Sequence, residues 1–574
     1  MRKTQNLIIV LVLLISWGSS NAQNSYRENQ SVTTYLSPTR ILWKIGDVKN
    51  ENRLLKKGNS QADLTNADMC ILENKKDGKA SILLDFGKEL HGGIQIITGI
   101  WPGNKPIKVR IRFGESVGEA MSDVGGKGGA TNDHAIRDLE TILPWLGTAD
   151  FGNTGFRFVR IDLLEDNVKL YLKEVRAAAK YRDIAYKGSF NSSDTLLNKI
   201  WKTGAYTVHL NMQDYLWDGI KRDRLVWVGD LNPEIATINA VFGYNEVVPK
   251  SLDLAKETTP LPQWMNGISA YSMWWIINQQ QWYYYQGDLK YLKQQQTYLT
   301  GLLNQLISKI DENGVEKLDG WRFLDWPSSK DTTAIHAGLQ GMMMVSIQAG
   351  GDLLKRMGDL ETAKKCEIAL AKLRKHIPAQ NESKQAAALL SLGKLLDAKK
   401  ANAILNSGGN RNYSTFFGYY MLQAKANAGD YSGAIDVIRE YWGAMINLGA
   451  TTFWEDFNMD WTKNAGRIDE ILPDGKIDIH GNYGAFSYLG FRHSLAHGWA
   501  AGPTPWITEH VLGISVVEPG CKVVRIKPNL GDLKFAEGTF PTPIGLIKVK
   551  HQKMIDGTIK STIEAPKGVK IIRN

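Results

Sequence analysis

The stretch KGSFNSSDTLLNKIWKTGAYTVHLNM, residues 187–212, marks the place where the pattern of the chain changes from strand to helix. Ser192 or Ser193 can cap a helix, and the apolar side chains from Leu196 to Trp201 recur at the 3.6-residue period of a helix. Long amphipathic patterns separated by loops continue after it. This stretch therefore predicts the boundary between an N-terminal β region and a large helical region.

The residues before this boundary, from about 30 to 185, alternate apolar and polar side chains in short runs. Examples are SILLDFG, GIQIITGIW and IKVRIRFGE. Period-two alternation divided by Gly, Asn and Asp is typical of an antiparallel β-sandwich. Within it, KGGATNDH at 127–134 has the composition of a loop. The alternation returns at 511–574, which predicts a small C-terminal β-sandwich.

The helical region, about residues 186–510, is long enough for many paired helices. It has no evident internal sequence repeat, which disfavours a regular solenoid. Paired helices over this length are compatible with an α/α toroid, in which a binding site lies at one end of the axis. We expect three folded parts in the order β, α, β.

The N-terminus has the pattern of a secretory signal peptide. Met-Arg-Lys is followed by the apolar run LIIVLVLLISW, and small residues end at Ala22. The run is too short to cross a membrane, no cysteine for a lipid anchor lies near the cleavage point, and no later segment is a membrane-spanning candidate. We expect residues 1–22 to be removed and the mature protein to be secreted or periplasmic, without a membrane anchor.

Composition narrows the functional classes further. A net charge of +10 can favour acidic partners, but an ordinary solvated surface is the simpler explanation, and no concentrated basic arm indicates nucleic-acid binding. Cys70, Cys366 and Cys521 lie far apart without metal-binding spacing, which leaves one disulfide possible. The sequence has no Walker loop, Gly-x-Ser-x-Gly elbow, HExxH or EF-hand pattern. We therefore expect no metal or organic cofactor, and we infer no obligate protein partner.

The stretch DGIKRDRLVWVGD, residues 218–230, places three aspartates among basic side chains and a tryptophan. Cleavage of a glycosidic bond needs two carboxyl groups, one to protonate the leaving oxygen and one to activate water or attack the sugar. Taken alone, the stretch is more simply interpreted as a loop of ion pairs that leads into a helix. In that interpretation Asn232 caps the helix, Pro233 is its first residue and Glu234 its first-turn acid.

Three further stretches place an acid or a histidine beside tryptophans: LDGWRFLDWPSSKD (318–331), GATTFWEDF (449–457) and FRHSLAHGWAAGPTPW (491–506). Glu455, beside a tryptophan in a dry pocket, can have a shifted pKa or act as a base. Two indoles around Asp325 suit a sugar, because rings stack on its C–H faces while the carboxylate binds its hydroxyls. A lone histidine such as His497 is more often structural than catalytic. Judged alone, Glu455 and His497 are more simply interpreted as structural, and the 318–331 stretch is equally compatible with a structural role.

Together and in this order, D-G-x-K-R-D-R-L-x-W-x-G-D, G-A-T-T-x-W-E and S-L-x-H-G-W resemble the α-L-rhamnosidases of glycoside hydrolase family 78. The resemblance covers roughly residues 30–574 and is strongest over 186–515. It implies an (α/α)6 barrel catalytic domain flanked by N-terminal and C-terminal antiparallel β-sandwich domains. It also implies inverting hydrolysis that releases terminal α-L-rhamnose, or a related sugar, from poly- or oligosaccharides or glycosides.

The same resemblance implies roles for single residues. The general acid of the family falls on Asp223 and the general base on Glu455. Residues that bind the sugar are expected at Asp218, Arg222, Trp227, Asp230, Trp264, Trp321, Asp325, Trp326 and His497. The sequence departs from the family at one place, because the acid is usually a glutamate and Asp223 is one methylene shorter. Glu234 is the nearest alternative proton donor.

Two other functions stay open on the sequence. The same toroid also carries other glycosidases and lyases that act on uronic-acid polysaccharides, and a lyase would need a His or Tyr base beside the uronic acid. The second is a sugar-binding protein that kept the pocket but lost the catalytic acid, which the change at Asp223 allows.

Overall fold

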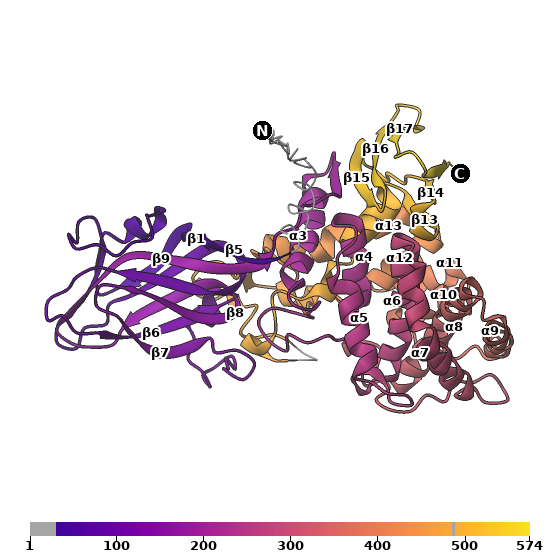
Figure 1. Cartoon of the computed structure of the whole chain (residues 1–574), viewed down its shortest axis with the longest axis horizontal. Helices are drawn as coiled ribbons and strands as arrows, with labels where there is room; N and C mark the ends of the chain where they lie inside the picture. The colour runs from indigo at the N-terminus through magenta and orange to yellow at the C-terminus, as the bar shows by residue number, and fades with distance from the viewer. Residues whose placement is uncertain (1–29, 485–487, 574) are drawn as a thin grey trace, which may run out of the picture.

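The computed structural model of the chain describes residues 30–484 and 488–573 (Figure 1). The expected signal peptide, residues 1–22, lies outside the described residues. No helix in the described part of the chain combines the length and the apolar character needed to cross a membrane. Cys70, Cys366 and Cys521 are buried free thiols, so the disulfide that their number allows is not formed.

The N-terminal part is an antiparallel sheet of nine strands. They are β1 (Ser31–Leu36), β2 (Arg40–Ile45), β3 (Asp47–Lys49), β4 (Cys70–Asn74), β5 (Ser81–Thr98), β6 (Ile107–Gly114), β7 (Asp138–Leu143), β8 (Thr148–Leu163) and β9 (Val168–Arg182). Their order is β3-β4-β9-β5-β8-β6-β7, with β1 on β9 and β2 on β5. Register shifts interrupt the β5–β8 pairing after Asp85 and after Gly92. The alternating apolar residues of β4, β5, β6, β8 and β9 share one buried core, as period-two patterning requires.

The middle of the chain is helical. Its helices are α3 (Thr195–Asn211), α4 (Leu231–Val241), α5 (Val247–Glu257), α6 (Ser269–Gln286), α7 (Leu289–Ser308), α8 (Thr332–Met357), α9 (Leu360–Leu373), α10 (Lys384–Leu392), α11 (Ala398–Asn406), α12 (Gly418–Asn427), α13 (Tyr431–Val437), α14 (Gly443–Asn447) and α15 (Pro503–Trp506). Helices α4, α6, α8, α10, α12 and α15 contact one another in succession, and α15 returns to α4. The remaining contacts place α3, α7, α9, α11 and α13 against this closed ring.

Two helices begin at residues other than the predicted ones. Helix α3 is capped by Asp194, whose carboxylate accepts the N–H groups of Leu196 and Leu197, and not by Ser192 or Ser193. An aspartate caps as well as a serine, so composition alone did not choose between them. Helix α4 begins at Leu231 with Asp230 as its cap, two residues before the predicted Asn232.

A short strand precedes the first helix of the part predicted to begin at residue 186. Residues Ser189–Ser192 form a strand, β10, which pairs with β15 (Phe535–Thr542) near the far end of the chain. The C-terminal sheet is therefore β10-β15-β16-β17, with β16 (Gly545–Lys553) and β17 (Ile559–Glu564). A second sheet contains β13 (Ile514–Glu518), β14 (Val523–Ile526) and β18 (Lys570–Ile572). Both sheets pack on the helical core.

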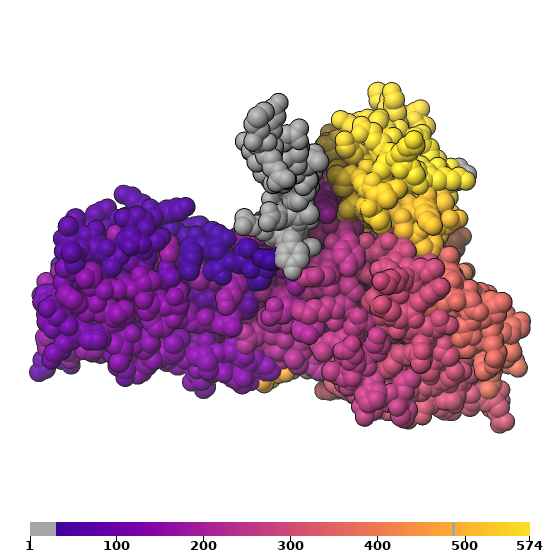
Figure 2. Space-filling model, in the orientation of Figure 1, coloured from indigo at the N-terminus to yellow at the C-terminus, as the bar shows by residue number. Residues whose placement is uncertain are grey.

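The N-terminal sheet lies directly against the helical part, and the C-terminal sheets stand on another side of it (Figure 2). Buried charges connect the first two parts. The Arg157 guanidinium on β8 lies 2.8 Å from Asp85 on β5 and 3.3 Å from Asp469, and it donates to the carbonyl of Gly449 at 3.0 Å. These interactions join the N-terminal sheet to the helical part and form only when the two parts lie against each other.

Candidate active site

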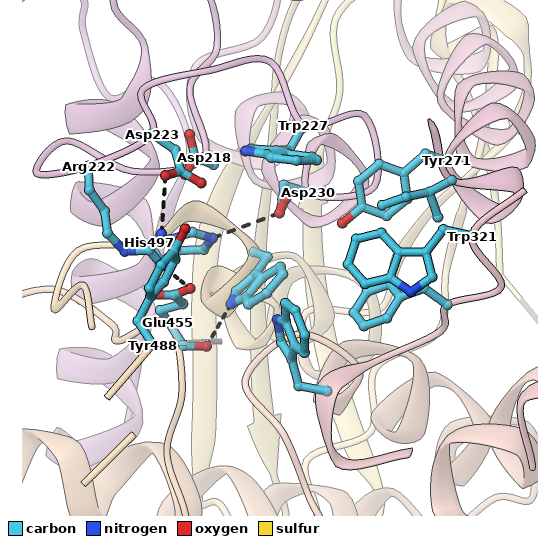
Figure 3. Close-up of a pocket in the computed structure, with 14 residues that line it drawn as sticks. Asp218, Arg222, Asp223, Trp227, Asp230, Tyr271, Trp321, Glu455, Tyr488 and His497 are labelled. Atoms are coloured by element: carbon cyan, nitrogen blue, oxygen red, sulfur yellow. Dashed lines mark hydrogen bonds and ion pairs between the residues drawn. The ribbon is translucent and has the colours of Figure 1, made fainter. Parts of the chain in front are cut away.

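One pocket of about 280 Å³ contains most of the predicted site residues. It is lined by Asp218, Arg222, Asp223, Trp227, Asp230, Ile268, Tyr271, Trp321, Phe323, Trp326, Glu455, Tyr488, His497 and Trp499. Several of these residues lie just before or in the first turn of the ring helices α4 and α6. Figure 3 shows the charged residues on one side of the pocket and the rings of Trp227, Tyr271 and Trp321 on the other. Stretches far apart in sequence therefore meet at one end of the helical ring.

The 218–230 loop has an unusual backbone at the predicted acid. Asp223 and Arg224 both adopt the left-handed conformation, with φ of 52° and 55°. Such a conformation costs a residue with a side chain of the order of 1 kcal/mol or more, so it persists only where neighbours hold it. Leu225 N donates to the Asp218 carboxylate at 2.9 Å within the loop. The loop also hydrogen-bonds to the 497–498 segment, where Gly498 N donates to the carbonyl of Asp218 at 2.8 Å.

Arg222 stands between the two predicted catalytic carboxyl groups. One terminal nitrogen lies 3.2 Å from Asp223 Oδ1, and the other forms an ion pair with Glu455 Oε1. The guanidinium stacks under the ring of Tyr488, 3.6 Å from its centroid. Arg222 is buried, so its planar fork holds both carboxylates with little solvent screening.

Glu455 is arranged as a carboxylate. Ser494 N donates to its Oε2 at 3.1 Å, and its backbone carbonyl accepts the indole N–H of Trp499 at 2.9 Å. Burial opposes the charged form, but the charge and hydrogen bond of Arg222 and the two neighbouring histidines together outweigh it and hold the pKa of Glu455 well below its usual range. A carboxylate of this kind can accept a proton from water only weakly in the ground state, and gains basicity if substrate binding loosens its partner.

Asp218 and Asp230 show the opposite behaviour. Burial raises the pKa of both carboxyl groups well above the usual value. The negative charge of Asp223 adds to this effect at Asp218, and that of Asp218 adds to it at Asp230. Burial lowers the pKa of His497 to about 3, so this imidazole is neutral. Asp230 Oδ1 and His497 Nδ1 are buried and form no hydrogen bond with any described residue. Buried polar atoms normally have partners, so these atoms are free to bind a ligand with hydroxyl groups.

The aromatic side of the pocket is built from short contacts between rings. Trp227 meets Tyr271 edge to face at 6.1 Å between centroids, and Trp321 meets Trp326 at 6.1 Å. Trp321 is half exposed, at 50%, and so belongs to the mouth of the pocket. Such rings offer apolar faces on which the C–H groups of a sugar can stack.

Three residues considered from the sequence lie outside this pocket. Trp264 is not part of the lining, and its indole N–H donates to Asp319 at 2.8 Å. Asp325 turns away beneath Trp326 and accepts from Ser414 at 2.5 Å and from Gln385 at 3.2 Å. Glu234, the alternative donor, is buried and bonded to Asn211 at 3.1 Å.

The structure also adds residues that sequence reasoning missed. Tyr271 lies in the first turn of α6, and Tyr488 lies in a stretch with no recognised motif. His134, from the predicted 127–134 loop of the N-terminal sheet, lies 3.1 Å from Asp223 Oδ1. None of these residues has a local pattern that marks it, because each reaches the pocket only through tertiary packing.

A buried group beside the pocket has the composition of a metal site. Candidate ligand atoms of Glu115, Glu119 and His480 all lie within 4.8 Å of one another. The ammonium of Lys221, however, lies 2.9 Å from Glu115 and 3.4 Å from Glu119. It also donates to the carbonyl of His493 at 2.7 Å. Lys221 thus supplies the positive charge that these carboxylates need.

Comparison with known proteins gives the relationship. Residues 185–377 match the bacterial α-L-rhamnosidase 6 hairpin glycosidase domain, and residues 513–572 match the bacterial α-L-rhamnosidase C-terminal domain. An α-L-rhamnosidase of Alteromonas sp. (strain LOR) is 26% identical over 545 residues, which cover 85% of this chain and 55% of that protein. The chain thus spans about half the length of this curated relative.

Solved structures share the fold. A family 78 rhamnosidase of Bacillus sp. GL1 superposes with a TM-score of 0.73 at 20% identity, covering 92% of this chain and 55% of the other. A rhamnosidase of Klebsiella oxytoca with rhamnose bound superposes with a TM-score of 0.67 at 17% identity, covering 85% and 97%. Residues 185–377 and 513–572 thus belong to bacterial α-L-rhamnosidase domain families, and the chain shares its fold with family 78 rhamnosidases.

Proposed function

We propose that this protein is a glycoside hydrolase that releases terminal α-L-rhamnose, or a closely related sugar, from a glycan or glycoside. The observation that carries the proposal is the meeting of Asp223 and Glu455 on either side of Arg222, in a pocket with an aromatic wall. The matches to α-L-rhamnosidase domains supply the choice of sugar.

In the proposed mechanism Glu455 is the base and Asp223 the acid. A water oxygen attacks the anomeric carbon while Glu455 takes a proton from that water. The bond from the anomeric carbon to the leaving oxygen breaks, and Asp223 gives that oxygen a proton. An inverting enzyme needs space for the water, typically a separation of ~6.5–9.5 Å between the carboxyl groups. The guanidinium of Arg222 between the two carboxylates is consistent with such spacing.

The remaining pocket residues fit a 6-deoxy sugar. Asp230 Oδ1 and His497 Nδ1, which form no hydrogen bond with a described residue, can bind hydroxyl groups. Ile268 and Phe323 add apolar surface to the lining, where the C6 methyl group of such a sugar would be buried favourably. A dry, apolar patch is less suited to the C6 carboxylate of a uronic acid.

The uronic-acid alternatives have less support. Among the described lining residues, the positively charged side chain is that of Arg222, and it is already paired with Asp223 and Glu455. It is therefore less able to pair with the carboxylate of a uronic acid. His497 is neutral because of its burial, so it brings no charge to a substrate carboxylate.

We also infer that the helices form an (α/α)6 barrel. Support comes from the closed ring of α4, α6, α8, α10, α12 and α15 with other helices outside it, and from the match to a six-hairpin glycosidase domain. The pattern of the first 22 residues supports export of the mature protein.

The test is hydrolysis of 4-nitrophenyl α-L-rhamnoside and of rhamnose-containing plant and algal polysaccharides, with the anomer of the released sugar followed by NMR. We expect β-L-rhamnose as the first product, and loss of activity in Glu455→Gln. Glu361→Gln, a change at an exposed carboxylate on α9, is the matched control. Sugar binding without turnover that Glu455→Gln leaves unchanged would instead indicate a non-catalytic binding protein.

A further inference from the structure

We propose that His134, in the loop before β7 of the N-terminal part, positions Asp223 and returns to it the proton that it donates in each turnover. The proposal rests on the function proposed above and adds a residue from another part of the chain to its acid. His134 Nδ1 lies 3.1 Å from Asp223 Oδ1 and 3.2 Å from Asp223 N.

The N-terminal sheet holds the strained turn that carries Asp223. Arg224 donates to the carbonyls of Asn153 at 3.1 Å and His134 at 2.9 Å. On β8, a Cβ at Gly155 would lie 3.0 Å from Lys221 N, so a glycine allows this close approach of the strand to the loop. The left-handed backbone at Asp223 and Arg224 is therefore supported by the neighbouring sheet, as a strained site requires.

The position of His134 Nδ1 allows two protonation states. When Nδ1 carries a proton, it can donate to the Asp223 carboxylate. When it does not, its lone pair can accept the Asp223 backbone N–H or the proton of an Asp223 carboxylic acid. Both arrangements use the distances present, so a proton can pass between Nδ1 and Oδ1 without movement of either backbone.

The proton balance of the cycle can be written in full. After Asp223 protonates the leaving oxygen, it is a carboxylate between Arg222 and His134. The His134 Nδ1–H bond then breaks and an O–H bond forms on Asp223, which leaves the imidazole neutral. The ring is 27% exposed and recovers a proton from water. The proton that Glu455 takes from the attacking water is released to solvent, so no proton is gained or lost overall.

Other charged groups face this pair from the elements around it. Arg222 and Arg224 flank Asp223 in its own loop, and Asp218 adds a buried carboxyl group. Asp133 Oδ2 lies 3.7 Å from His134 Nε2 and is itself paired with Arg492. The His134 ring also meets Tyr488 edge to face at 6.0 Å. After each turnover Asp223 lacks the proton that it donated, so a group that can supply one must lie within hydrogen-bond reach if Asp223 is to act again as an acid.

The first test separates positioning from proton transfer. His134→Gln keeps an amide that can accept the Asp223 N–H and donate to its carboxylate, but it cannot transfer a proton. His134→Ala removes both functions. Ile136→Ala changes an exposed side chain of the same loop and is the control. Rates are measured on 4-nitrophenyl α-L-rhamnoside, whose leaving group needs little acid, and on a rhamnosyl disaccharide, whose leaving group needs it.

We expect His134→Gln and His134→Ala to lower kcat on the disaccharide by about tenfold or more, which is part of the roughly 100- to 10,000-fold that general acid catalysis contributes. On the aryl substrate, kcat falls less than about threefold, and KM changes little on either substrate. Added imidazole restores the disaccharide rate of His134→Ala. Equal losses on both substrates without rescue, full activity of His134→Gln, or unchanged rates in both variants would each overturn the proposal.

A second measurement does not depend on activity. The chain has ten histidines, so the ¹⁵N signals of a histidine-labelled sample can be assigned by substitution. Asp223→Asn is expected to shift the Nδ1 signal of His134 and to leave the distant His336 unchanged. No shift at His134 overturns the proposal. A wild-type protein inactive on every rhamnoside but showing this shift overturns the proposed function alone.

Discussion

The buried guanidinium of Arg222 forms an ion pair with the buried carboxylate of Glu455. This pair ties the loop before α4 to the loop after α14, and it keeps the predicted base ionised inside a pocket that would otherwise favour the neutral acid. The first prediction follows from that electrostatic balance.

Replacing Arg222 by Gln should raise the pKa of Glu455, because burial then acts without an opposing charge. The acid limb of the pH–rate profile should therefore move to higher pH, and kcat/KM should fall by about 100-fold or more. Removing one partner of a buried pair also typically costs about 3–5 kcal/mol of stability. Arg222→Lys should move the acid limb part of the way back to its wild-type pH. Arg411→Gln, a change at an exposed arginine, should not move it.

Glu234→Gln should leave acid catalysis largely intact, since Glu234 is bonded to Asn211 outside the pocket. Asp223→Asn should lower the rate on a rhamnosyl disaccharide by about 100-fold or more, within the range of general acid catalysis, while sparing much of the rate on an aryl rhamnoside. Comparison of both variants on both substrates identifies the donor. A selective loss on the disaccharide in Glu234→Gln would move the acid to that residue.

Asp325→Asn should flatten the pH dependence of stability. Burial raises the pKa of Asp325 to about 6, against hydrogen bonds from Ser414 and Gln385 that lower it. The native state therefore binds a proton more tightly than the unfolded state, and stability falls as pH rises from about 4 to about 6. The loss amounts to about 3 kcal/mol. Thermal unfolding midpoints at pH 4 and pH 7 should differ less in the variant than in the wild type; identical differences would contradict this.

Trp321→Ala should weaken substrate binding without slowing the chemical step. Trp321 is half exposed at the mouth, and a lost aromatic contact costs about 0.5–1.5 kcal/mol, or roughly 2- to 12-fold in affinity. KM should rise by that factor with kcat nearly constant, most clearly on long substrates. Trp264→Ala, a change outside the pocket lining, serves as a comparison whose effect should appear mainly in stability. A fall in kcat for Trp321→Ala would place this ring at the reacting sugar.

Lys221→Met should destabilise the contact between the N-terminal sheet and the helical part. It leaves Glu115 and Glu119 buried without their nearest cation, at a cost of about 3–5 kcal/mol. The double variant Lys221→Met, Glu115→Gln should recover part of this loss, because one uncompensated charge is removed with its partner. Additive losses, measured by thermal unfolding, would show that the pair is not coupled.

Much of the fold follows from local pattern, and the exceptions have physical causes. Period-two and 3.6-residue patterns are properties of each segment, so the strand and helix regions could be predicted. The cap at Asp194 depended on which of several suitable residues the backbone selects. The pairing of β10 with β15 joins residues more than 300 positions apart, and no local pattern encodes it.

The site divides in the same way. Asp218, Arg222, Asp223, Trp227 and Asp230 lie close in sequence and share the pocket. The orientation of Asp325 away from it could not be predicted, because the choice depends on Ser414 and Gln385 from other helices and loops. His134 and Tyr488 could not be predicted as site residues either, because only tertiary packing brings them near Asp223 and Arg222.

The pairing of β10 with β15 also limits how the chain can be divided. A fragment starting at residue 511 would lack β10, and β15 would become an edge strand with unpaired N–H and C=O groups, a common cause of aggregation. A fragment ending before residue 511 would leave β10 without its partner. In evolutionary terms, the C-terminal sheet cannot be exchanged between proteins as a continuous cassette unless the four residues of β10, Ser189–Ser192, travel with it.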